Sequence, residues 1–581
     1  MNKSFFITFG VLFAMIFCLA GLALSEPQVK IMGPFNEAML TIQKAEPPTP
    51  GKLSKTVKLT PEQKKYLSGP GEFAIYGSSK PISKEQILKL KELKLRRGFS
   101  SVMDNQILPN NEDMIKSNNL YSITGTKQKI INNRGYFGED FYSTAVTQSE
   151  VSSAVYGQNI VAGWNDIETY FFGPYNSIAN WAVSHDGGKT FTDSLSGLPT
   201  SPAPGITETL GDPAVGVGPD GTFYFSTLCT YTDSTPTVYS AICVYNSTDN
   251  GNSFDLWRYL FASDTNDFLD KPFMAVDPNN GKVYVAYTYF DDVSPLYTIE
   301  VWNVTDATPP AGIDSNDSGL QGPIPAVSLD GTVYVAYEEW DSSGNRYIKL
   351  RKSSDFYATK VNVASVISAA DWVIGGDASA FCGSLIGITT RDAIKGNIRS
   401  NDFPSLAVDT RTSGNGAGNL YIAFNARDNN PLTRYLNIYL TRSTDGGATW
   451  SAPIMANPRP AGDESDKFFP WVTVNGKGKV GLVYYERKKT PGITGIAPNN
   501  WWIFTRVLRF KHDLTLLDSL NVSPPFPVVT NNDYSAPCYM AEYNSISANR
   551  LTADDNFYVF WGDNRYGDPD IQFSKVIPVV P

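Results

Sequence analysis

One pattern recurs along most of this chain and constrains its fold more than any other feature. An apolar run leads into a turn rich in Pro, Asp, Asn or Gly, and a strongly alternating aromatic and aliphatic run follows, as in "DPAVGVGPDGTFYFST". The seven copies begin at Glu150, Asp212, Asp270, Gly322, Asp402, Asp466 and Glu542. Alternation with a period of two, aromatic and β-branched residues, and turns such as PDG and NNG all predict paired β-strands.

The spacing of the copies predicts how these strands assemble. Each interval has room for four short strands, and helical spacing is scarce after about residue 140. Four-stranded units in series bury their faces against their neighbours, and closure into a ring removes exposed edges. We therefore predict an all-β fold: a β-propeller of six or seven four-stranded blades, with seven favoured, over residues 135–581.

A second repeat lies out of phase with the first. "RSTDGGATW", "SHDGGKTF" and "STDNGNSF" share Ser, Asp, Gly and an aromatic at fixed offsets, and "SSDFYATK" is a degraded relative. The motif resembles the Asp box, or BNR repeat, of sialidases and other Asp-box propellers, over roughly residues 140 to 578. The resemblance implies a structural hairpin between the third and fourth strands of a blade, built by Ser184, Asp186, Gly188, Ser247, Asp249, Gly251, Ser443, Asp445 and Gly447. It implies a fold rather than an activity, because Asp boxes also occur in lyases, other glycosidases and noncatalytic proteins.

Propeller topology indicates which residues could meet a ligand. The Asp boxes lie on one face, and the loops before first strands and after second strands share the other. Before first strands these loops carry Glu150, Asp212, Asp270, Lys271, Asp402, Asp466, Lys467, Glu542 and Tyr543. After second strands they carry Trp164, Asp166, Asp291, Asp292, Glu338, Glu339, Arg427, Asp428, Glu486, Arg487, Trp561, Asp563 and Arg565. Carboxylates, arginines and aromatic rings together suit a polar, hydroxyl-rich ligand such as a glycan.

A finer resemblance suggests a catalytic assignment. "LYIAFNARDNNPLTRYLNIYLTRSTDGGATW" looks like the sialidase blade in which an arginine, here Arg427, holds the substrate carboxylate. In the same chain order, Arg487 takes the place of a later carboxylate-binding arginine and Tyr543 that of the nucleophilic tyrosine. Asp402 stands where the family has the glutamate that polarises this tyrosine, and Asp166 is available as the acid. We expect further substrate contacts from Arg565, Glu486 and Trp561.

The sequence also departs from the sialidase pattern. No arginine opens the first repeat, "SEVSSAV", and seven repeats replace the usual six blades. Arg427, Arg487 and Arg565 occupy equivalent repeat positions, in "NARD", "YERK" and "GDNR", which also suits a structural role capping the blades. Ligand contact and blade capping both stay open for these arginines.

Other chemistries find little support in the sequence. The two histidines, His185 and His512, offer neither zinc-ligand spacing nor a Ser/His/Asp triad. No cofactor is expected, although acidic turns such as "ADDN" and "GDPD" leave a structural calcium ion open. The net charge of −10 speaks against nucleic acid as a partner, because phosphate binding needs a basic face.

The N-terminus and the cysteines indicate export. Residues 1–25 carry Lys3, the apolar run "FFITFGVLFAMIFCLAGLAL" and small residues before Glu26, which is typical of a secretory signal; an uncleaved membrane anchor is the alternative. We expect a secreted or extracytoplasmic protein, in the periplasm or at the cell surface. Four cysteines then remain, an even number in an exported chain. Cys229 and Cys243 can face each other across a hairpin, which leaves Cys382, in an insertion at about residues 356–400, to pair with Cys538.

Residues 26–134 form a different region. From Glu26 to Ser100, fourteen basic residues stand against seven acidic ones, and "SKEQILKLKELKLRR" predicts one helix. A pro-segment, a linker and a clamp on the acidic propeller are all open for this extension. The last repeat has no room for a fourth strand, and we predict that a strand near Gly135 to Ala145 completes it.

Two classes of function remain open. One is an exported exo-glycosidase resembling exo-α-sialidase, and the other is a noncatalytic propeller that binds glycans or proteins. In either case we expect a monomer whose partner is a glycan or a cell-surface ligand. The sequence leaves open whether the protein is an enzyme.

Overall fold

The computed structural model describes most of the repeat region and short pieces of the N-terminal extension. Described are residues 57–60, 63, 67, 71, 126–130, 148–294, 296–354, 359–366, 393–394, 398–427, 435–489, 501–526, 539–549, 551, 554–563 and 570–577. The chain divides into two compact units, residues 1–48 with 83–99 and residues 49–82 with 100–581. Everything described below belongs to the second unit. The predicted signal sequence and the helix predicted for "SKEQILKLKELKLRR" both lie outside the described residues.

The second unit contains seven four-stranded antiparallel sheets, as the seven repeats predict. Blade 1 consists of β2 (Gln148–Tyr156), β3 (Asn159–Asp166), β4 (Ala179–Ser184) and β5 (Thr192–Asp193). Blade 2 consists of β6 (Gly205–Val217), β7 (Phe223–Thr232), β8 (Val238–Ser247) and β9 (Asp255–Phe261). Blade 3 consists of β10 (Phe268–Val276), β11 (Val283–Phe290), β12 (Tyr297–Asn303) and β13 (Ala311–Asn316). Blade 4 consists of β14 (Leu320–Val327), β15 (Val333–Trp340), β16 (Arg346–Lys352) and β17 (Val361–Val366).

The remaining blades follow the same order. Blade 5 consists of β20 (Ser405–Val408), β21 (Leu420–Arg427), β22 (Leu436–Ser443) and β23 (Ile454–Met455). Blade 6 consists of β24 (Asp466–Val474), β25 (Val480–Lys489), β26 (Trp501–Phe510) and β27 (Leu516–Asn521). Blade 7 consists of β28 (Ser545–Ser547), β29 (Phe557–Asp563), β30 (Asp570–Val576) and β1 (Thr126–Ile130). A short helix, α7 (Ile167–Phe172), follows β3, and β18 (Ala393–Ile394) pairs with β19 (Ile398–Arg399).

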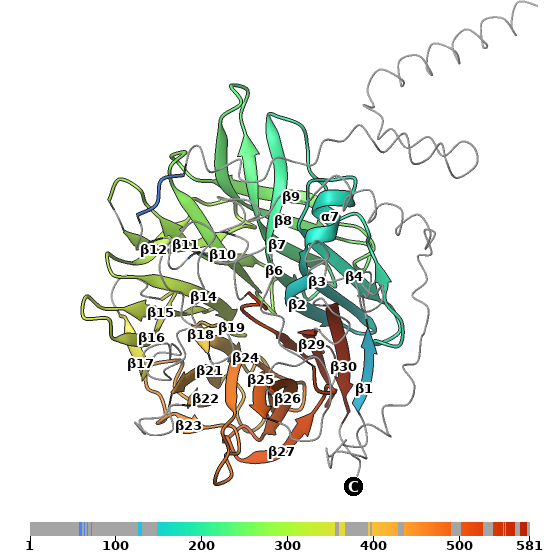
Figure 1. Cartoon of the computed structure of the whole chain (residues 1–581), viewed down its shortest axis with the longest axis vertical. Coiled ribbons are helices and arrows are strands. Elements are labelled where there is room, and N and C mark those ends of the chain that lie inside the picture. Colours follow the sequence, from blue (N-terminus) through green and yellow to red (C-terminus); the bar gives the residue numbers. More distant parts are fainter. Residues whose placement is uncertain are drawn as a thin grey trace, which may run out of the picture. The chain divides into compact units, whose positions relative to one another are not determined.

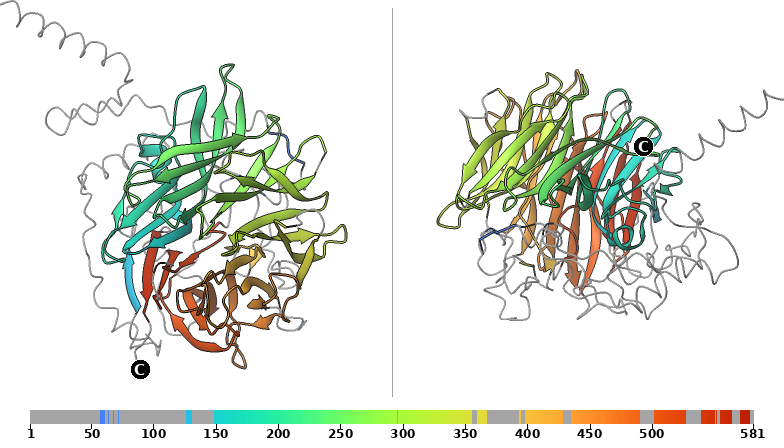
Figure 2. Two further views of the ribbon diagram at one scale, coloured as in Figure 1. Left: turned by 180° about the vertical axis from the view of Figure 1, so that it is seen from behind. Right: turned by 90° about the horizontal axis from the view of Figure 1, so that it is seen from above.

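The sheets follow one another around a ring (Figures 1 and 2). First strands of successive blades contact each other, and β2 also contacts β28, so the ring is closed. The apolar clusters lie between neighbouring sheets; for example, Trp181 of blade 1 packs with Phe225 and Phe254 of blade 2. Each blade therefore buries its apolar faces against its neighbours, as the repeat pattern requires.

The ring closes with a strand from the N-terminal extension. β1 pairs antiparallel with β30 from Thr126 opposite Val576 to Ile130 opposite Gln572. The predicted principle, an early strand completing the last blade, is correct, but the strand lies before the predicted boundary at residue 135. The segment named for this role, Gly135 to Ala145, lies outside the described residues. "TKQKI" carries little apolar alternation, so its sequence gives little sign of a strand.

The predicted Asp-box hairpins follow β4, β8 and β22. In the first, the Ser184 hydroxyl donates to Asp186, the Gly188 amide donates to the Ser184 oxygen at 2.9 Å, and the Thr190 amide donates to Asp186 at 2.8 Å. Ser247 with Asp249, and Ser443 with Asp445, repeat this network. Hydrogen bonds from Thr190, Ser184 and Lys189 outweigh partial burial and lower the pKa of Asp186 to about 2.

The glycine of each hairpin fits against the preceding blade. Gly251 has φ +92°, and a Cβ atom there would lie 2.4 Å from Val161 of blade 1. A Cβ atom at Gly188 would likewise come too close to Phe573 of blade 7, and one at Gly447 too close to Leu350 of blade 4. We call the side of the ring that carries these hairpins the box face. The opposite side, where first strands begin and second strands end, is the loop face.

The structure contains a disulfide between Cys229 of β7 and Cys243 of β8, as predicted. Both cysteines are buried in the cluster between blades 1 and 2. Cys382 and Cys538 lie outside the described residues, so their pairing stays a prediction.

Short pieces of the N-terminal extension pack against blade 3. Val57, Leu59 and Leu67 are buried in the apolar cluster around β10 to β13. The Gln63 side chain donates a hydrogen bond to the carbonyl oxygen of Asp291 at 2.8 Å. The backbone amide of Lys58 donates one to the carbonyl oxygen of Asn266 at 3.2 Å. Both acceptors lie in loop-face connections, so these residues belong to the folded propeller unit. In the described part of the chain, no helix combines the length and apolarity needed to cross a membrane.

Candidate functional site

The first strands carry a local distortion where they begin on the loop face. The ladder skips between Ser149 and Ser152, and equivalent shifts occur in blades 2, 3, 4 and 6. The residue inside the bulge has positive φ: Glu150 (54°), Asp212 (53°), Lys271 (55°) and Phe469 (53°), with Gly322 (64°) in blade 4. Four non-glycine residues in this sparsely populated region mark a strained and repeated feature of the inner ring.

Charged residues from four blades meet at this level. Lys271 Nζ lies 2.5 Å from Glu542 Oε2, 2.9 Å from Asp212 Oδ1 and 3.4 Å from Glu150 Oε1. Their side chains are at most 3% exposed. Residues of blades 1, 2, 3 and 7 can converge in this way only at the centre of the ring. We call Glu150, Asp212, Lys271 and Glu542 the axial cluster.

The protonation of the axial cluster is asymmetric. Burial raises the pKa of Glu150 well above its ordinary value; the carboxylates of Asp212 and Glu542 raise it further, and Lys271 opposes them. Burial alone would lower the pKa of Lys271, but Asp212, Glu150 and Glu542 raise it above its ordinary value. Lys271 also lies closer to Asp212 and Glu542 than to Glu150. Burial therefore favours the neutral form of the Glu150 carboxyl, whereas the surrounding carboxyls favour the charged form of Lys271.

Asn165 joins the cluster to the blade structure. Its Nδ2 donates to Glu150 Oε2 at 3.1 Å, and its Oδ1 accepts from the Asp212 amide at 3.0 Å. Asn425 repeats this link in blades 5 and 6: it donates to Asp402 at 3.2 Å and accepts from the Phe469 amide at 3.1 Å. This role was not predicted, although an asparagine at equivalent second-strand positions, in "WND" and "FNA", is its sequence signal.

Tyr543, the predicted nucleophile, lies beside the axial cluster. Lys271 Nζ is 5.1 Å from the centre of its ring, and its hydroxyl donates to the Pro213 carbonyl oxygen at 3.0 Å. Burial raises the pKa of Tyr543 well above its ordinary value, and nearby Glu150 and Asp212 raise it further. The phenol is thus held in its neutral form with its proton engaged.

A small cavity adjoins the cluster. Its walls come from five blades, which places it at the centre of the ring; they are Phe273, Ile324, Asn401, Phe403, Pro404, Phe469, Pro470, Trp471, Glu542 and Tyr543. Phe273, Trp471 and Tyr543 pack against one another, with ring centres 5.1 to 5.8 Å apart. Glu542 is the charged residue of this wall, and no lysine or arginine of the described chain lines it.

Of the predicted arginines, Arg427 and Arg487 lie in the second strands of blades 5 and 6. Arg487, in β25, is 3.3 Å from Asp466 of the paired strand and lies 4.1 Å from the centre of the Trp501 ring. Burial lowers the pKa of Arg487 to about 10, and Asp466 opposes this shift. Arg427 is buried at the end of β21, and Arg565 lies outside the described residues. For Arg487 the contacts within its own blade support the capping interpretation.

Asp402 and Asp166 each have partners of their own. Asp402 accepts from Arg346 Nη1 at 2.7 Å, a residue of blade 4 that the sequence did not single out. Asp166 accepts from Asn180 at 2.9 Å and from the Trp164 indole at 3.3 Å. The Trp561 indole donates to Asp563 at 3.2 Å in the same relation. Asp166 and Asp563 thus end their second strands in the same way, which supports a structural role for Asp166.

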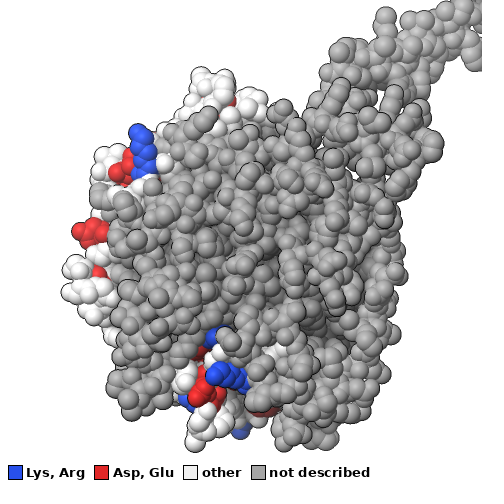
Figure 3. Space-filling model, viewed as in Figure 1, with Lys and Arg blue, Asp and Glu red and all other residues white. Residues whose placement is uncertain are grey.

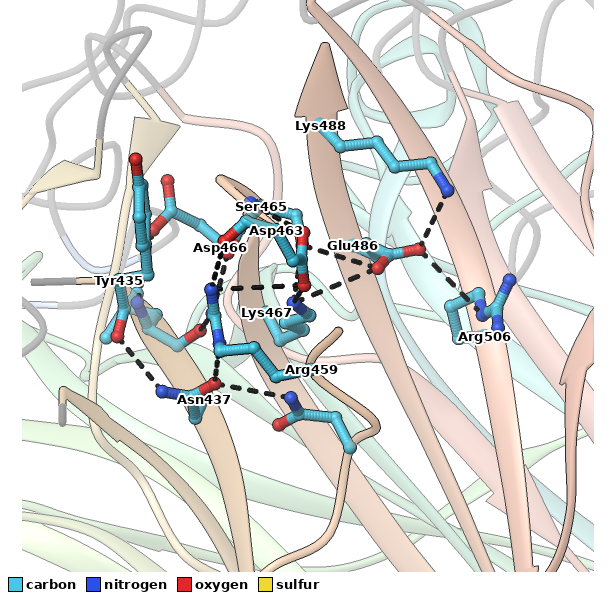
Figure 4. A network of polar contacts seen from close by, with 12 residues as sticks. Tyr435, Asn437, Arg459, Asp463, Ser465, Asp466, Lys467, Glu486, Lys488 and Arg506 are labelled. Carbon is cyan, nitrogen blue, oxygen red and sulfur yellow. Dashed lines mark hydrogen bonds and ion pairs between the residues drawn. The ribbon is translucent and has the colours of Figure 1, made fainter. Parts of the chain in front are cut away.

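Glu486 belongs to a separate polar network between blades 5 and 6 (Figure 4). Its carboxylate lies 3.5 Å from Lys488, 3.9 Å from Arg506 and 3.9 Å from Lys467. Lys467 is also 2.5 Å from Asp463. Burial lowers the pKa of Lys467, and the hydrogen bond to Asp463 opposes this shift.

The described residues contain no group of three or more His, Cys, Asp or Glu arranged to hold a metal ion. On the face shown in Figure 3, described side chains of both charge signs lie along the rim.

Comparisons with known proteins show distant likeness only. No family model matches the chain, and no curated protein sequence does. A Dyadobacter fermentans protein of unknown function has 14% identity and a TM-score of 0.40, covering 78% of this chain and 99% of its own. Hadza microbial sialidase Hz136 has 12% identity and a TM-score of 0.36; the match covers 78% of this chain and 95% of the sialidase. The GH93 α-L-arabinofuranosidase of Fusarium graminearum, solved with arabinobiose, has 13% identity and a TM-score of 0.36. The match covers 78% of this chain and 97% of the arabinofuranosidase. At these values the likenesses say nothing of this chain's substrate.

Proposed function

We propose that this protein is an exported glycoside hydrolase that works at the axial cluster. The observation that carries the proposal is the convergence of three carboxyl groups on one lysine at the centre of the loop face, where burial raises the pKa of Glu150. Hydrolysis of a glycosidic bond needs a carboxylic acid and a carboxylate kept in opposite protonation states by their surroundings.

The residues divide these roles by their environment. Glu150, whose pKa is raised, supplies the proton to the leaving oxygen. Asp212 and Glu542, closest to Lys271, are the candidates for the carboxylate that activates water or attacks the sugar carbon. Lys271 holds all three in place. Glu542 also lies in the wall of the adjoining cavity.

The same geometry favours neutral glycosides over sialosides. A sialic acid carboxylate needs guanidinium groups around it, whereas the charged residue in the cavity wall is Glu542. Arg487 is engaged by Asp466 and Trp501. Tyr543 has its hydroxyl bonded to Pro213, so we assign the nucleophilic or basic role to a carboxylate.

The test is hydrolysis of fluorogenic neutral glycosides and α-sialosides by the purified protein and its variants. Glu150→Gln is expected to lower kcat/KM at least about a hundredfold, because it removes the acid. Asp306→Asn, which removes an exposed carboxylate paired with Lys282, is the control and should retain activity. Loss of activity in Tyr543→Phe together with full activity in Glu150→Gln would overturn the assignment in favour of a sialidase-type nucleophile.

A noncatalytic glycan-binding propeller is the second candidate, and one observation favours it. The side chains of Lys271 and Glu150 are fully buried and paired, as they would be in an ion cluster that merely seals the ring. In that case the wild-type protein would cleave none of the glycosides, and Glu150→Gln would leave glycan binding unchanged.

A further inference from the structure

Four aromatic rings form one group on blade 2, away from the axial cluster. They come from three strands: Tyr231 of β7, Tyr239 of β8, and Tyr259 and Phe261 of β9. Tyr231 stacks on Phe261 with ring centres 4.5 Å apart and planes 12° apart, and on Tyr259 at 5.7 Å and 18°. Tyr239 lies 5.4 Å from Phe261. We call these four residues the blade 2 aromatic group.

The group is accessible. Tyr259 is 42% exposed and Phe261 is 44% exposed, and within the described part of the chain no other aromatic side chain is as open to solvent. Tyr231, Tyr239 and Phe261 lie where β7 ends, β8 begins and β9 ends, which is the loop-face end of the blade. Exposed rings held in contact with one another, rather than scattered singly, mark a binding surface.

The structure beneath the group is rigid. The Cys229–Cys243 disulfide joins the two strands that carry Tyr231 and Tyr239, and Tyr259 is the ladder partner of Cys243. Tyr231 packs against the buried cluster that contains both cysteines. The rings are therefore held in position before any ligand arrives, which lowers the entropic cost of binding.

The chemistry of the group favours a carbohydrate. Ring faces accept the apolar face of a sugar, the three tyrosine hydroxyls can bond to its hydroxyl groups, and none of the four side chains carries a charge. A stable protein interface buries about 800 Å² on each partner from about 20 to 30 residues, far more than four side chains provide. We propose that the blade 2 aromatic group is a second binding site, for a neutral polysaccharide chain, separate from the axial cluster.

The experiment is affinity gel electrophoresis of the full chain through gels containing arabinan, galactan, xylan or β-glucan. At least one polymer should retard the wild-type protein, and Tyr259→Ala/Phe261→Ala should weaken that retardation about tenfold or more, as loss of central aromatic contacts does. Leu516→Ala/Leu517→Ala is the matched control, because these residues are 41% and 38% exposed on the outermost strand of blade 6.

The outcomes separate this site from the axial cluster. Glu150→Gln should be retarded like the wild type even if it hydrolyses nothing, so failure of the proposed hydrolase leaves the proposed surface standing. No retardation of the wild type by any of the four polymers, or equal retardation of Tyr259→Ala/Phe261→Ala and the wild type, would overturn the proposal. Because both residues lie on the outermost strand of blade 2 and are partly exposed, circular dichroism should show unchanged folding of the variant.

Discussion

Lys271 is the cation that neutralises the axial cluster. Lys271→Met would keep much of the side chain's volume and leave three buried carboxyl groups without their cation. Breaking a buried ion pair in this way costs about 3 to 5 kcal/mol. We expect the free energy of unfolding, measured in urea at neutral pH, to fall by that amount.

Lys282→Met is the control for this loss. Lys282 pairs with Asp306 at 2.6 Å, but the two side chains are 39% and 41% exposed, and exposed pairs contribute at most about 1 kcal/mol. Equal losses in the two lysine variants would show that the axial cluster is solvated rather than buried.

Glu150 should make stability depend on pH. Its pKa is raised in the folded state, so the folded protein binds a proton that the unfolded chain releases above the ordinary value of 4.5. The free energy of unfolding therefore falls as pH rises from about 5 toward the raised pKa. Glu150→Gln, which cannot ionise, should show a shallower decline in urea midpoints between about pH 5 and 8, and a steeper decline would contradict the assignment.

Part of this site could be predicted from the sequence. Repeat position placed Glu150, Asp212, Lys271, Glu542 and Tyr543 together on the loop face. Their pairing could not be read from the sequence, because contacts among blades 1, 2, 3 and 7 depend on the geometry of the closed ring rather than on local pattern. The sialidase comparison directed attention to arginines and Tyr543 instead.

At the scale of single elements, the hairpin glycines should control how neighbouring blades fit. Gly251→Ala adds a Cβ in a left-handed conformation, 2.4 Å from Val161. Backbone strain and overpacking together should cost about 2 to 5 kcal/mol. Gly344 also has a positive φ, +79°, but open space around it. Gly344→Ala should therefore lose only the stability that backbone strain costs, about 1 to 2 kcal/mol. Thermal unfolding of the two variants checks the difference; equal losses would rule out the inter-blade contact.

Strands were predictable where their side chains are buried. Aromatic and aliphatic runs identified the inner strands of all seven blades, because both faces of those strands meet neighbouring sheets. The sequence pattern missed β1, because "TKQKI" has no alternation of aromatic or apolar residues. The predicted closing strand therefore lies too late in the chain. An outermost strand is specified mainly by backbone pairing, which leaves little trace in side-chain pattern.

At the scale of the whole molecule, truncation should separate two roles of the N-terminal extension. A chain that begins at residue 101 keeps β1 but loses Val57, Leu59 and Leu67 from the blade 3 cluster. A chain that begins at residue 136 also loses β1, so β30 keeps β29 on one side but has an open edge on the other. We expect melting temperatures to fall in that order, with association of the shorter chain through its open edge, seen by size-exclusion chromatography. Equal stability of the two truncated chains would show that β1 is dispensable.

The pairing of β1 with β30 also sets the order of events in the life of the chain. One of the first strands to be synthesised waits for one of the last, so six blades can form in sequence while the seventh stays incomplete. We therefore expect closure of the ring to be the last step of folding. It should be slower than hairpin formation, because it joins strands that are far apart in the sequence. A ribosome that stalls before β30 is made would therefore release an arc of blades rather than a closed ring.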